Sequence, residues 1–227
     1  MNRFVYPLSL SLLFRTTVAF QSQRSLYTRY VTKATRMTGG CTAQCPSEQK
    51  LFNEFCEWRF EDSPEFATMF GVHRYDDKLE SYTLASFEAR RTKVCSFLER
   101  AKQLRLEKKN KQYSPASYED LDLFIEILQV YLDGYATRSY LFPLSTIDGL
   151  NVDLPLTISY MKFATVDDVS KLTRRLRAFP AQIEGVLEVM REGIRSKMTL
   201  HSVSLKNMVE TLTDLIEKEP SKTPYYR

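Results

Sequence analysis

The sequence has little glycine and little histidine, and these shortages exclude several classes of protein. Seven glycines among 227 residues are too few for a turn-rich all-β fold or for the glycine loops of a nucleotide-binding α/β fold. The two histidines, His73 and His201, form neither His-Glu-x-x-His nor Glu-x-x-His, so no zinc or di-metal motif is predicted. The absence of Gly-Lys and Gly-x-Ser-x-Gly likewise excludes a P-loop and a serine nucleophile elbow.

Cysteine is also sparse. The four cysteines match neither Cys-x-x-Cys nor a paired zinc ribbon, and they stand at Cys41, Cys45, Cys56 and Cys95. Such spacing predicts unpaired thiols rather than a disulfide framework or a metal site.

Acidic residues are missing from the first 47 positions, which hold six Lys and Arg residues. The whole chain carries a formal charge of +4 from 32 basic and 28 acidic residues. Without those six basic residues the remaining chain holds 26 basic and 28 acidic residues, a charge of −2. A nucleic-acid-binding domain needs many phosphate-neutralising cations, so no nucleic-acid partner is expected.

Residues 1–46 are predicted to be a disordered targeting presequence. Their apolar run, 4–14, is about half of the ~20 residues that span a bilayer, so no stable membrane span is expected. The following stretch is basic and hydroxylated, and Val18-Ala19-Phe20 resembles the motif of bipartite plastid presequences. A plastid or a mitochondrion is the favoured destination, secretion is the alternative, and Met37 as the true start would remove the leader.

Residues 47–227 are predicted to form one all-α domain, a bundle of about six to seven helices. Apolar spacings of three and four residues, with caps and breaks, predict helices from residue 47 and over 65–70, 83–106, 115–140, 165–178, 180–195 and 202–218. The fourth is apolar over more than half its girth and should be central. Pro143, Gly149 and Pro155 predict a long ordered loop over 141–163, and Phe179-Pro180 predicts a break between two antiparallel helices.

Two charged patterns are interpreted as solvated helix surfaces. Glu54, Glu57, Glu61 and Glu65 step by three and four residues, without a histidine beside them to suggest a metal site. A basic cluster, interleaved with Glu99 and Glu107, comprises Arg100, Lys102, Arg105, Lys108, Lys109 and Lys111. Cations near a helix C-terminus are favourable, which explains this cluster without RNA.

The densest group of reactive side chains lies in the connection after Gly71. His73, Arg74, Tyr75 and Asp76 are the substrate-cleft candidates, because functional groups gather on loops. The competing interpretation is structural: His73 and Tyr75 hydrogen-bond the loop, and Arg74 pairs with an acid. No catalytic residue is assigned.

Several segments resemble the domain-of-unknown-function 885 family over about residues 50–227. These are Phe55-Cys-Glu-Trp-Arg59, Asp62-Ser-Pro-Glu-Phe-Ala-Thr68, Gly71-Val-His-Arg-Tyr-Asp-Asp77, Asp153-Leu-Pro155, Phe163-Ala-Thr165, Arg175-Leu-Arg-Ala-Phe-Pro-Ala181 and Met190-Arg-Glu-Gly-Ile194. The segments keep the order that the family has.

The resemblance implies a mostly helical, zinc-metallopeptidase-like hydrolase whose zinc-binding His-Glu helix lies in the C-terminal half. No position of this chain matches that helix, so we expect no cofactor here, although zinc is implied for full-length relatives. The chain would be the non-catalytic N-terminal half of a longer, peptide-binding protein. The alternative is a free-standing helical interaction or regulatory module, with self-association as a further expectation.

Overall fold

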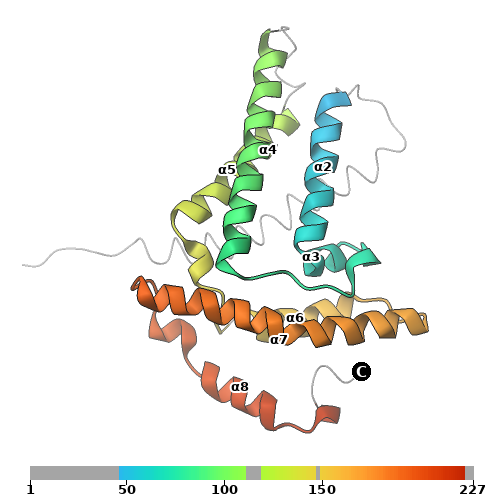
Figure 1. The fold of residues 1–227 in the computed structure, drawn as a ribbon, viewed down its shortest axis with the longest axis vertical. Coiled ribbons are helices and arrows are strands. Elements are labelled where there is room, and N and C mark those ends of the chain that lie inside the picture. Colours follow the sequence, from blue (N-terminus) through green and yellow to red (C-terminus); the bar gives the residue numbers. More distant parts are fainter. Residues whose placement is uncertain (1–45, 111–118, 147–148, 223–227) are drawn as a thin grey trace, which may run out of the picture. The chain divides into compact units, whose positions relative to one another are not determined.

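The computed structural model describes residues 46–110, 119–146 and 149–222, and in these ranges the chain is all-α, as predicted (Figure 1). Seven α-helices and four 3₁₀ turns occur there, without a strand. The predicted presequence lies outside the described residues, apart from Pro46. None of the described helices is long and apolar enough to cross a membrane.

The described residues divide by their contacts into two compact units. Unit 1 comprises residues 97–139 with the beginning of α2 (Pro46–Asp62), and unit 2 comprises residues 50–96 and 140–227. Because α2 and α4 (Leu84–Asn110) run through both sets of residues, each helix supplies side chains to both units.

Unit 1 is built from the C-terminal half of α4 and from α5 (Glu119–Ala136). Its core holds Phe97, Leu98, Ala101, Leu121, Phe124 and Leu128. The last three follow one stripe of α5, so the prediction that α5 is surrounded on all sides is wrong. The helix also ends at Ala136, four residues early, where Arg138 has a positive φ of 53°.

The C-terminal end of α4 is longer than the sequence predicts. Residues 107–110 lie beyond the predicted helix over 83–106, but α4 continues to Asn110. The ammonium group of Lys108 lies 2.5 Å from a carboxylate oxygen of Glu48, and both side chains are buried. A buried ion pair with Glu48 therefore holds a residue that the spacing assigned to solvent.

Unit 2 contains the short helix α3 (Pro64–Met69), which begins and ends one residue before the predicted helix over 65–70. Ser63-Pro64-Glu65 opens it, and Gly71 follows it with a φ of +77°, a left-handed conformation that suits glycine. Helix α3 packs against α6 (Leu150–Tyr160) and against the 3₁₀ turn η1 (His73–Tyr75).

The existence of α6 contradicts the predicted loop over 141–163. Gly149, with a φ of +124°, precedes the helix, and its carbonyl accepts hydrogen bonds from the backbone N–H groups of Val152 and Asp153. Pro155 inside a helix costs about 3 kcal/mol. Burying an aliphatic side chain gains about 1.5–3 kcal/mol, and the buried Leu154 and Ile158 offset that cost.

Helix α7 (Val166–Arg195) is continuous, so the predicted antiparallel pair with a break at Pro180 is wrong. Thr165 caps its beginning in a capping box with Asp168, and bonds from Thr165 hold the pKa of Asp168 below its usual value. Beyond Pro180 the same face continues, because Arg175 and Gln182, seven residues apart, are both buried.

Helix α8 (Met208–Glu217) is shorter than the predicted helix over 202–218, and the 3₁₀ turn η5 (Pro220–Lys222) follows it. Residues 202–205 form the 3₁₀ turn η4. Asn207 then adopts a left-handed backbone with a φ of 61°, and this interrupts the helical pattern before α8 begins.

Candidate functional site

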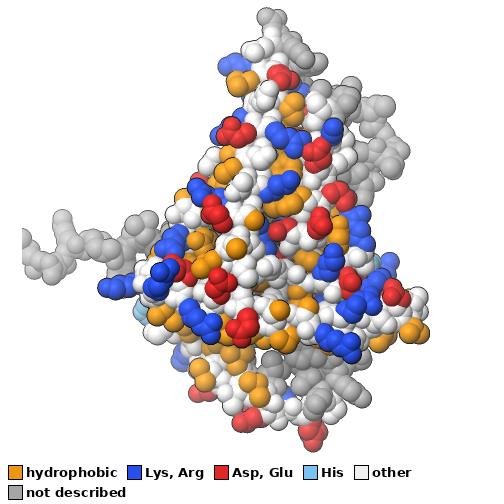
Figure 2. Space-filling view, in the orientation of Figure 1, with side chains coloured by type: hydrophobic (Ala, Val, Ile, Leu, Met, Phe, Trp, Pro, Cys, Tyr) orange, Lys and Arg blue, Asp and Glu red, His pale blue; other side chains and the backbone are white. Residues whose placement is uncertain are grey.

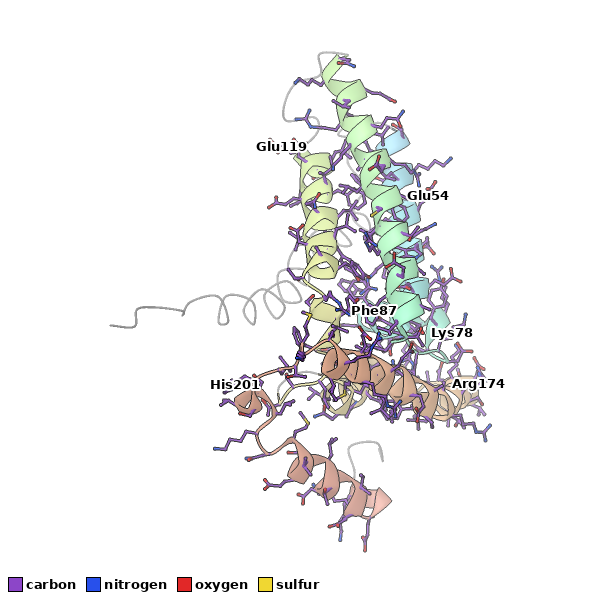
Figure 3. All side chains as sticks on the ribbon, turned by 60° about the vertical axis from the view of Figure 1, so that its left-hand side comes forward. Glu54, Lys78, Phe87, Glu119, Arg174 and His201 are labelled. Atoms are coloured by element: carbon purple, nitrogen blue, oxygen red, sulfur yellow. The ribbon has the colours of Figure 1, made fainter. Side chains whose placement is uncertain are left out.

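The candidate site is the connection 71–82 of unit 2, which leads from α3 to α4. It includes η1 and runs beside the part of α7 that carries Arg174, as the labels of Lys78 and Arg174 show in Figure 3. Nε of Arg174 lies 3.5 Å from a carboxylate oxygen of Asp77. All four predicted substrate-cleft residues belong to this connection.

Asp76 and His73 form the inner part of the connection. Asp76 is a buried residue, 2% exposed. Its carboxylate accepts a 2.7 Å hydrogen bond from the Thr68 hydroxyl. Its other oxygen lies 3.0 Å from Nδ1 of His73. The carboxylate therefore orients the imidazole, and it takes part in the packing of the loop rather than facing solvent.

Arg175 of α7 supports the connection from beneath. Its side chain is fully buried and donates hydrogen bonds to the carbonyls of Lys78 and Tyr75, at 2.9 and 3.1 Å, and to the Thr68 hydroxyl, at 2.9 Å. Nη2 also lies 3.9 Å from Asp76. Burial lowers the pKa of Arg175, because the charged form loses its hydration. Nη1 has no hydrogen-bond partner among the described residues.

Arg74 and Tyr75 form the outer part of the connection. The Arg74 side chain is half-exposed and pairs with Glu57 of α2. Its guanidinium lies 4.9 Å from the centroid of the Tyr75 ring, and the Lys78 ammonium lies 5.5 Å from the same centroid. Tyr75 is thus flanked by two cations, which gives this surface a positive, aromatic character.

A second polar cluster joins α3, the connection and α7 through two glutamates. One Glu65 carboxylate oxygen accepts a 2.6 Å hydrogen bond from the Gln182 amide, and the other accepts a 2.9 Å bond from the Glu80 backbone N–H. The Gln182 amide also donates to the Glu80 carbonyl at 3.0 Å. Burial and the nearby charge of Glu80 raise the pKa of Glu65 to about 7.

Arg90 of α4 supplies the main positive charge of this second cluster. Its Nε donates a 2.7 Å hydrogen bond to Asp62, and its Nη2 lies 3.3 Å from a Glu80 oxygen. Burial raises the pKa of Asp62 despite this cation.

Two further side chains complete the second cluster. The Ser63 hydroxyl donates to the Glu80 carboxylate. Burial, together with the charges of Glu80, Glu65 and Asp153, raises the pKa of Tyr82 well above its usual value. The cluster is therefore rich in acids that neighbouring donors stabilise.

The sequence predicted the first cluster in part and the second hardly at all. Arg74 pairs with an acid and His73 hydrogen-bonds within the loop, as the structural interpretation of this segment expected. Among the glutamates expected to face solvent, Glu57 and Glu61 are exposed, but the carboxylate of Glu65 points inward. Arg175 and Gln182 were not singled out, because their partners lie about 100 residues away in the sequence. Glu80 was not singled out either, although Ser63 and Glu65 lie within 17 residues of it.

The described residues do not fit the zinc ion that the resemblance implies. No three His, Cys, Asp or Glu side chains of the described ranges are grouped so that they could hold a metal ion. His73 is engaged by Asp76. We therefore derive no metal-dependent step from this chain.

In its described ranges the chain is an all-α protein with a buried polar network between α3, the connection and α7. The family model described as "Bacterial protein of unknown function (DUF885)" matches residues 64–226. The chain belongs to this family. The match begins at α3, so the resemblance of residues 55–59 to the family stays a prediction. None of the curated proteins matches the sequence.

Proposed function

We propose that this chain supplies a helical, substrate-facing part of a metallopeptidase-like hydrolase whose catalytic metal is held elsewhere. The observation that supports the proposal is the connection 71–82, which buried hydrogen bonds hold to α7 and which places Arg74 and Tyr75 on its outer side. Arg175 and Asp76 anchor it through buried hydrogen bonds. A surface that is ordered before its ligand arrives loses less conformational entropy on binding.

The ligand that suits this surface is a peptide. Arg74 and Lys78 lie against the Tyr75 ring, so a peptide carboxylate would meet cations and an apolar side chain would meet the ring. His73 would act at the edge of this surface, and Asp76 would position His73 without touching the peptide.

The proposal is tested in a full-length member of the family. Alanine at the positions matching His73 and Tyr75 should lower peptidase-type activity, mainly through KM, while the melting temperature changes little. Alanine at the position matching Glu61, which is exposed, serves as the control. Unchanged activity in the His73 and Tyr75 variants would overturn the role of the connection.

Metal content provides an independent check. The isolated chain should bind less than stoichiometric zinc after dialysis, because a structural or catalytic zinc site requires three or four ligands. One tightly bound zinc per chain would contradict the assignment of the metal to another part of the protein.

A second candidate function is a regulatory interaction module, which α8 favours. Its residues Val209 and Ile216 are about four-fifths exposed, and Val203 in η4 is also largely exposed. If α8 binds a full-length relative, Ile216→Asp should abolish co-purification of the two proteins while Glu210→Gln leaves it intact. Equal co-purification of both variants would exclude α8 as the contact.

The predicted presequence leads to a proposal on localisation. We propose that residues 1–46 direct the chain to a plastid or a mitochondrion, with secretion as the alternative route. Sequencing of the mature N-terminus distinguishes them: a start near Phe20 indicates signal peptidase, and a start between residues 37 and 46 indicates a transit peptidase. If the protein isolated from the organelle still began at Met1, the proposal that residues 1–46 are a cleaved targeting segment would be wrong.

A further inference from the structure

Helix α7 carries a second apolar face besides the one that is buried within unit 2. Spacings of three and four residues alternate along its whole length, through Val166, Val169, Thr173, Leu176, Pro180, Ile183, Leu187, Met190 and Ile194. We call these nine positions the α7 seam. The spacing is that of the a and d positions of a coiled coil, sustained over four heptads.

The α7 seam is distinct from the face that packs inside unit 2. The internal face holds Arg175, Gln182, Val186, Val189 and Gly193, all of which are buried. In the seam, by contrast, Val166 is 84% exposed, Val169 53%, Ile183 37% and Ile194 67%. Figure 2 shows hydrophobic side chains at the surface along this helix.

The extent of the seam argues for a binding partner of similar length. From residue 166 to residue 194 a helix rises about 42 Å at 1.5 Å per residue. Scattered surface aliphatic residues are ordinary, but an apolar line of this length is typical of an interaction surface.

The charges beside the seam favour an identical helix in the opposite direction. Arg177 and Glu184 are both exposed and lie on the same edge of the seam, seven residues apart. In an antiparallel pair of α7 helices, each Arg177 meets the Glu184 of the other copy, so two equivalent ion pairs form about a two-fold axis. The existing Arg191–Glu184 contact, at 4.0 Å between exposed side chains, is weak and can be exchanged for the new pair.

A parallel pair lacks this complementarity. On the other edge of the seam stand Leu172, Phe179 and Val186, which have no charge to offer Arg177 or Glu184. Val186 is moreover buried inside unit 2. Arg177 and Glu184 can therefore form ion pairs between two copies only when the two helices are antiparallel.

We propose that the α7 seam binds the α7 seam of a second copy of this chain, antiparallel, with Arg177 against Glu184. In this register Val169 meets Ile194 of the second copy, Thr173 meets Met190, and Leu176 meets Leu187. Val169, which is 53% exposed, and Ile194, which is 67% exposed, thereby cover each other near the two ends of the seam. The pairing provides a specific form of the self-association that the sequence leads us to expect, and it does not depend on the proposed hydrolase role.

Charge exchange in the full chain tests the pairing by sedimentation velocity over a range of protein concentrations. The unmodified chain should show a monomer–dimer equilibrium. Glu184→Arg should raise the dimer Kd about tenfold or more, because like charges then face each other at both contacts between positions 177 and 184, one on each side of the two-fold axis. Arg177→Glu alone should do the same, and the double variant Arg177→Glu/Glu184→Arg should restore the original Kd.

Glu188→Arg is the matched control, because Glu188 is an exposed acid of the same helix away from the seam, and its Kd should stay unchanged. Ile183→Asp should leave the chain monomeric with unchanged helical circular dichroism. A chain that is monomeric at every concentration, or a double variant no tighter than its single variants, would overturn the proposal. Either result would assign the seam to another protein or another segment.

Discussion

Arg175 is the residue on which the arrangement of the connection 71–82 depends. A guanidinium with no solvent exposure must be compensated by fixed acceptors, and two carbonyls and one hydroxyl provide them. This one side chain connects α7 to α3, through Thr68, and to the connection 71–82, through the carbonyls of Tyr75 and Lys78. An aliphatic side chain at this position would also be buried, but the two carbonyls and the Thr68 hydroxyl would lose the hydrogen-bond donor that Arg175 provides.

Replacing Arg175 should therefore destabilise the chain strongly. We expect Arg175→Met to lower the free energy of unfolding by about 3–5 kcal/mol, because it leaves Asp76 buried without its cation. Urea unfolding followed by circular dichroism measures this. Arg174→Met, at a neighbouring half-exposed position, should change the same free energy by less than about 0.5 kcal/mol. Equal effects of the two substitutions would contradict the anchoring role of Arg175.

Glu65 should make the stability depend on pH between about 4.5 and 7. Its pKa is raised from 4.5 to about 7 in the folded chain, so folding takes up a proton in this window. The stabilisation is fully present below the unfolded pKa of 4.5 and is lost as the pH rises through 7. A shift of this size corresponds to about 3 kcal/mol.

Glu65→Gln tests this prediction because it removes the titrating group and keeps the shape. The difference in unfolding free energy between the variant and the original chain should change across pH 4.5–7 and stay constant above pH 8. Glu61→Gln, at an exposed position, should show no such change. A parallel pH profile for the Glu65 variant would show that the carboxylate titrates normally.

At the scale of elements, local signals predicted boundaries well where they coincided. Ser63, Pro64 and Gly71 each indicate one end of α3, and Thr165 with Asp168 indicates the beginning of α7. These signals act through bonds within a few residues, which a sequence displays directly.

Prolines misled the prediction where packing outweighed their local cost. Pro155 and Pro180 were interpreted as helix breakers, but both lie inside helices. On both sides of Pro180 the helix is held to the same loop, by Arg175 and by Gln182. Such contacts join residues about 100 positions apart, and no local pattern contains them. For the same reason the sequence did not place Arg175 and Gln182 in the candidate site.

Helix α7 approaches the backbone of residues 82–83 so closely that a side chain at position 185 would be crowded. A Cβ atom there would lie 3.1 Å from the carbonyl carbon of Tyr82 and 3.2 Å from the nitrogen of Thr83. Gly185→Ala should lower the unfolding free energy by about 1–3 kcal/mol through overpacking, although alanine gains up to about 1 kcal/mol in helix propensity.

Gly134→Ala in α5 is the matched control for this close approach. Its added Cβ would meet only the hydroxyl of Ser139, at 3.2 Å, and that side chain can rotate away. The substitution should therefore stabilise the chain by about 0.5–1 kcal/mol. If Gly185→Ala stabilised the chain equally, the close approach of α7 to residues 82–83 would be disproved.

For the molecule as a whole, charge and family membership divide the chain at nearly the same place. The basic residues without acidic neighbours precede residue 48, and the family match begins at residue 64. The residues that match the family carry no net charge, with 23 basic and 23 acidic residues, and they follow a basic segment without acids.

Removing residues 1–46 should reverse the behaviour of the chain on ion exchangers. The formal charge changes from +4 to −2, so retention on a cation exchanger at pH 7 and low salt should disappear. Replacing the six basic residues of the leader by glutamine should have the same effect. Retention that survived both changes would locate a basic surface in the helical part.

The long-range bonds of Arg175 and Gln182 also determine how early this protein can be completed during synthesis. Their partners in residues 65–80 precede them by 97–117 positions. At 5–20 residues per second, a ribosome needs about 5–20 s to add a stretch of roughly 100 residues. For that time Asp76 and Glu65 lack the side chains that bury them in the finished fold. The contacts that join Thr68 and Glu65 of α3 to α7 therefore form only after residues 175 and 182 have been synthesised.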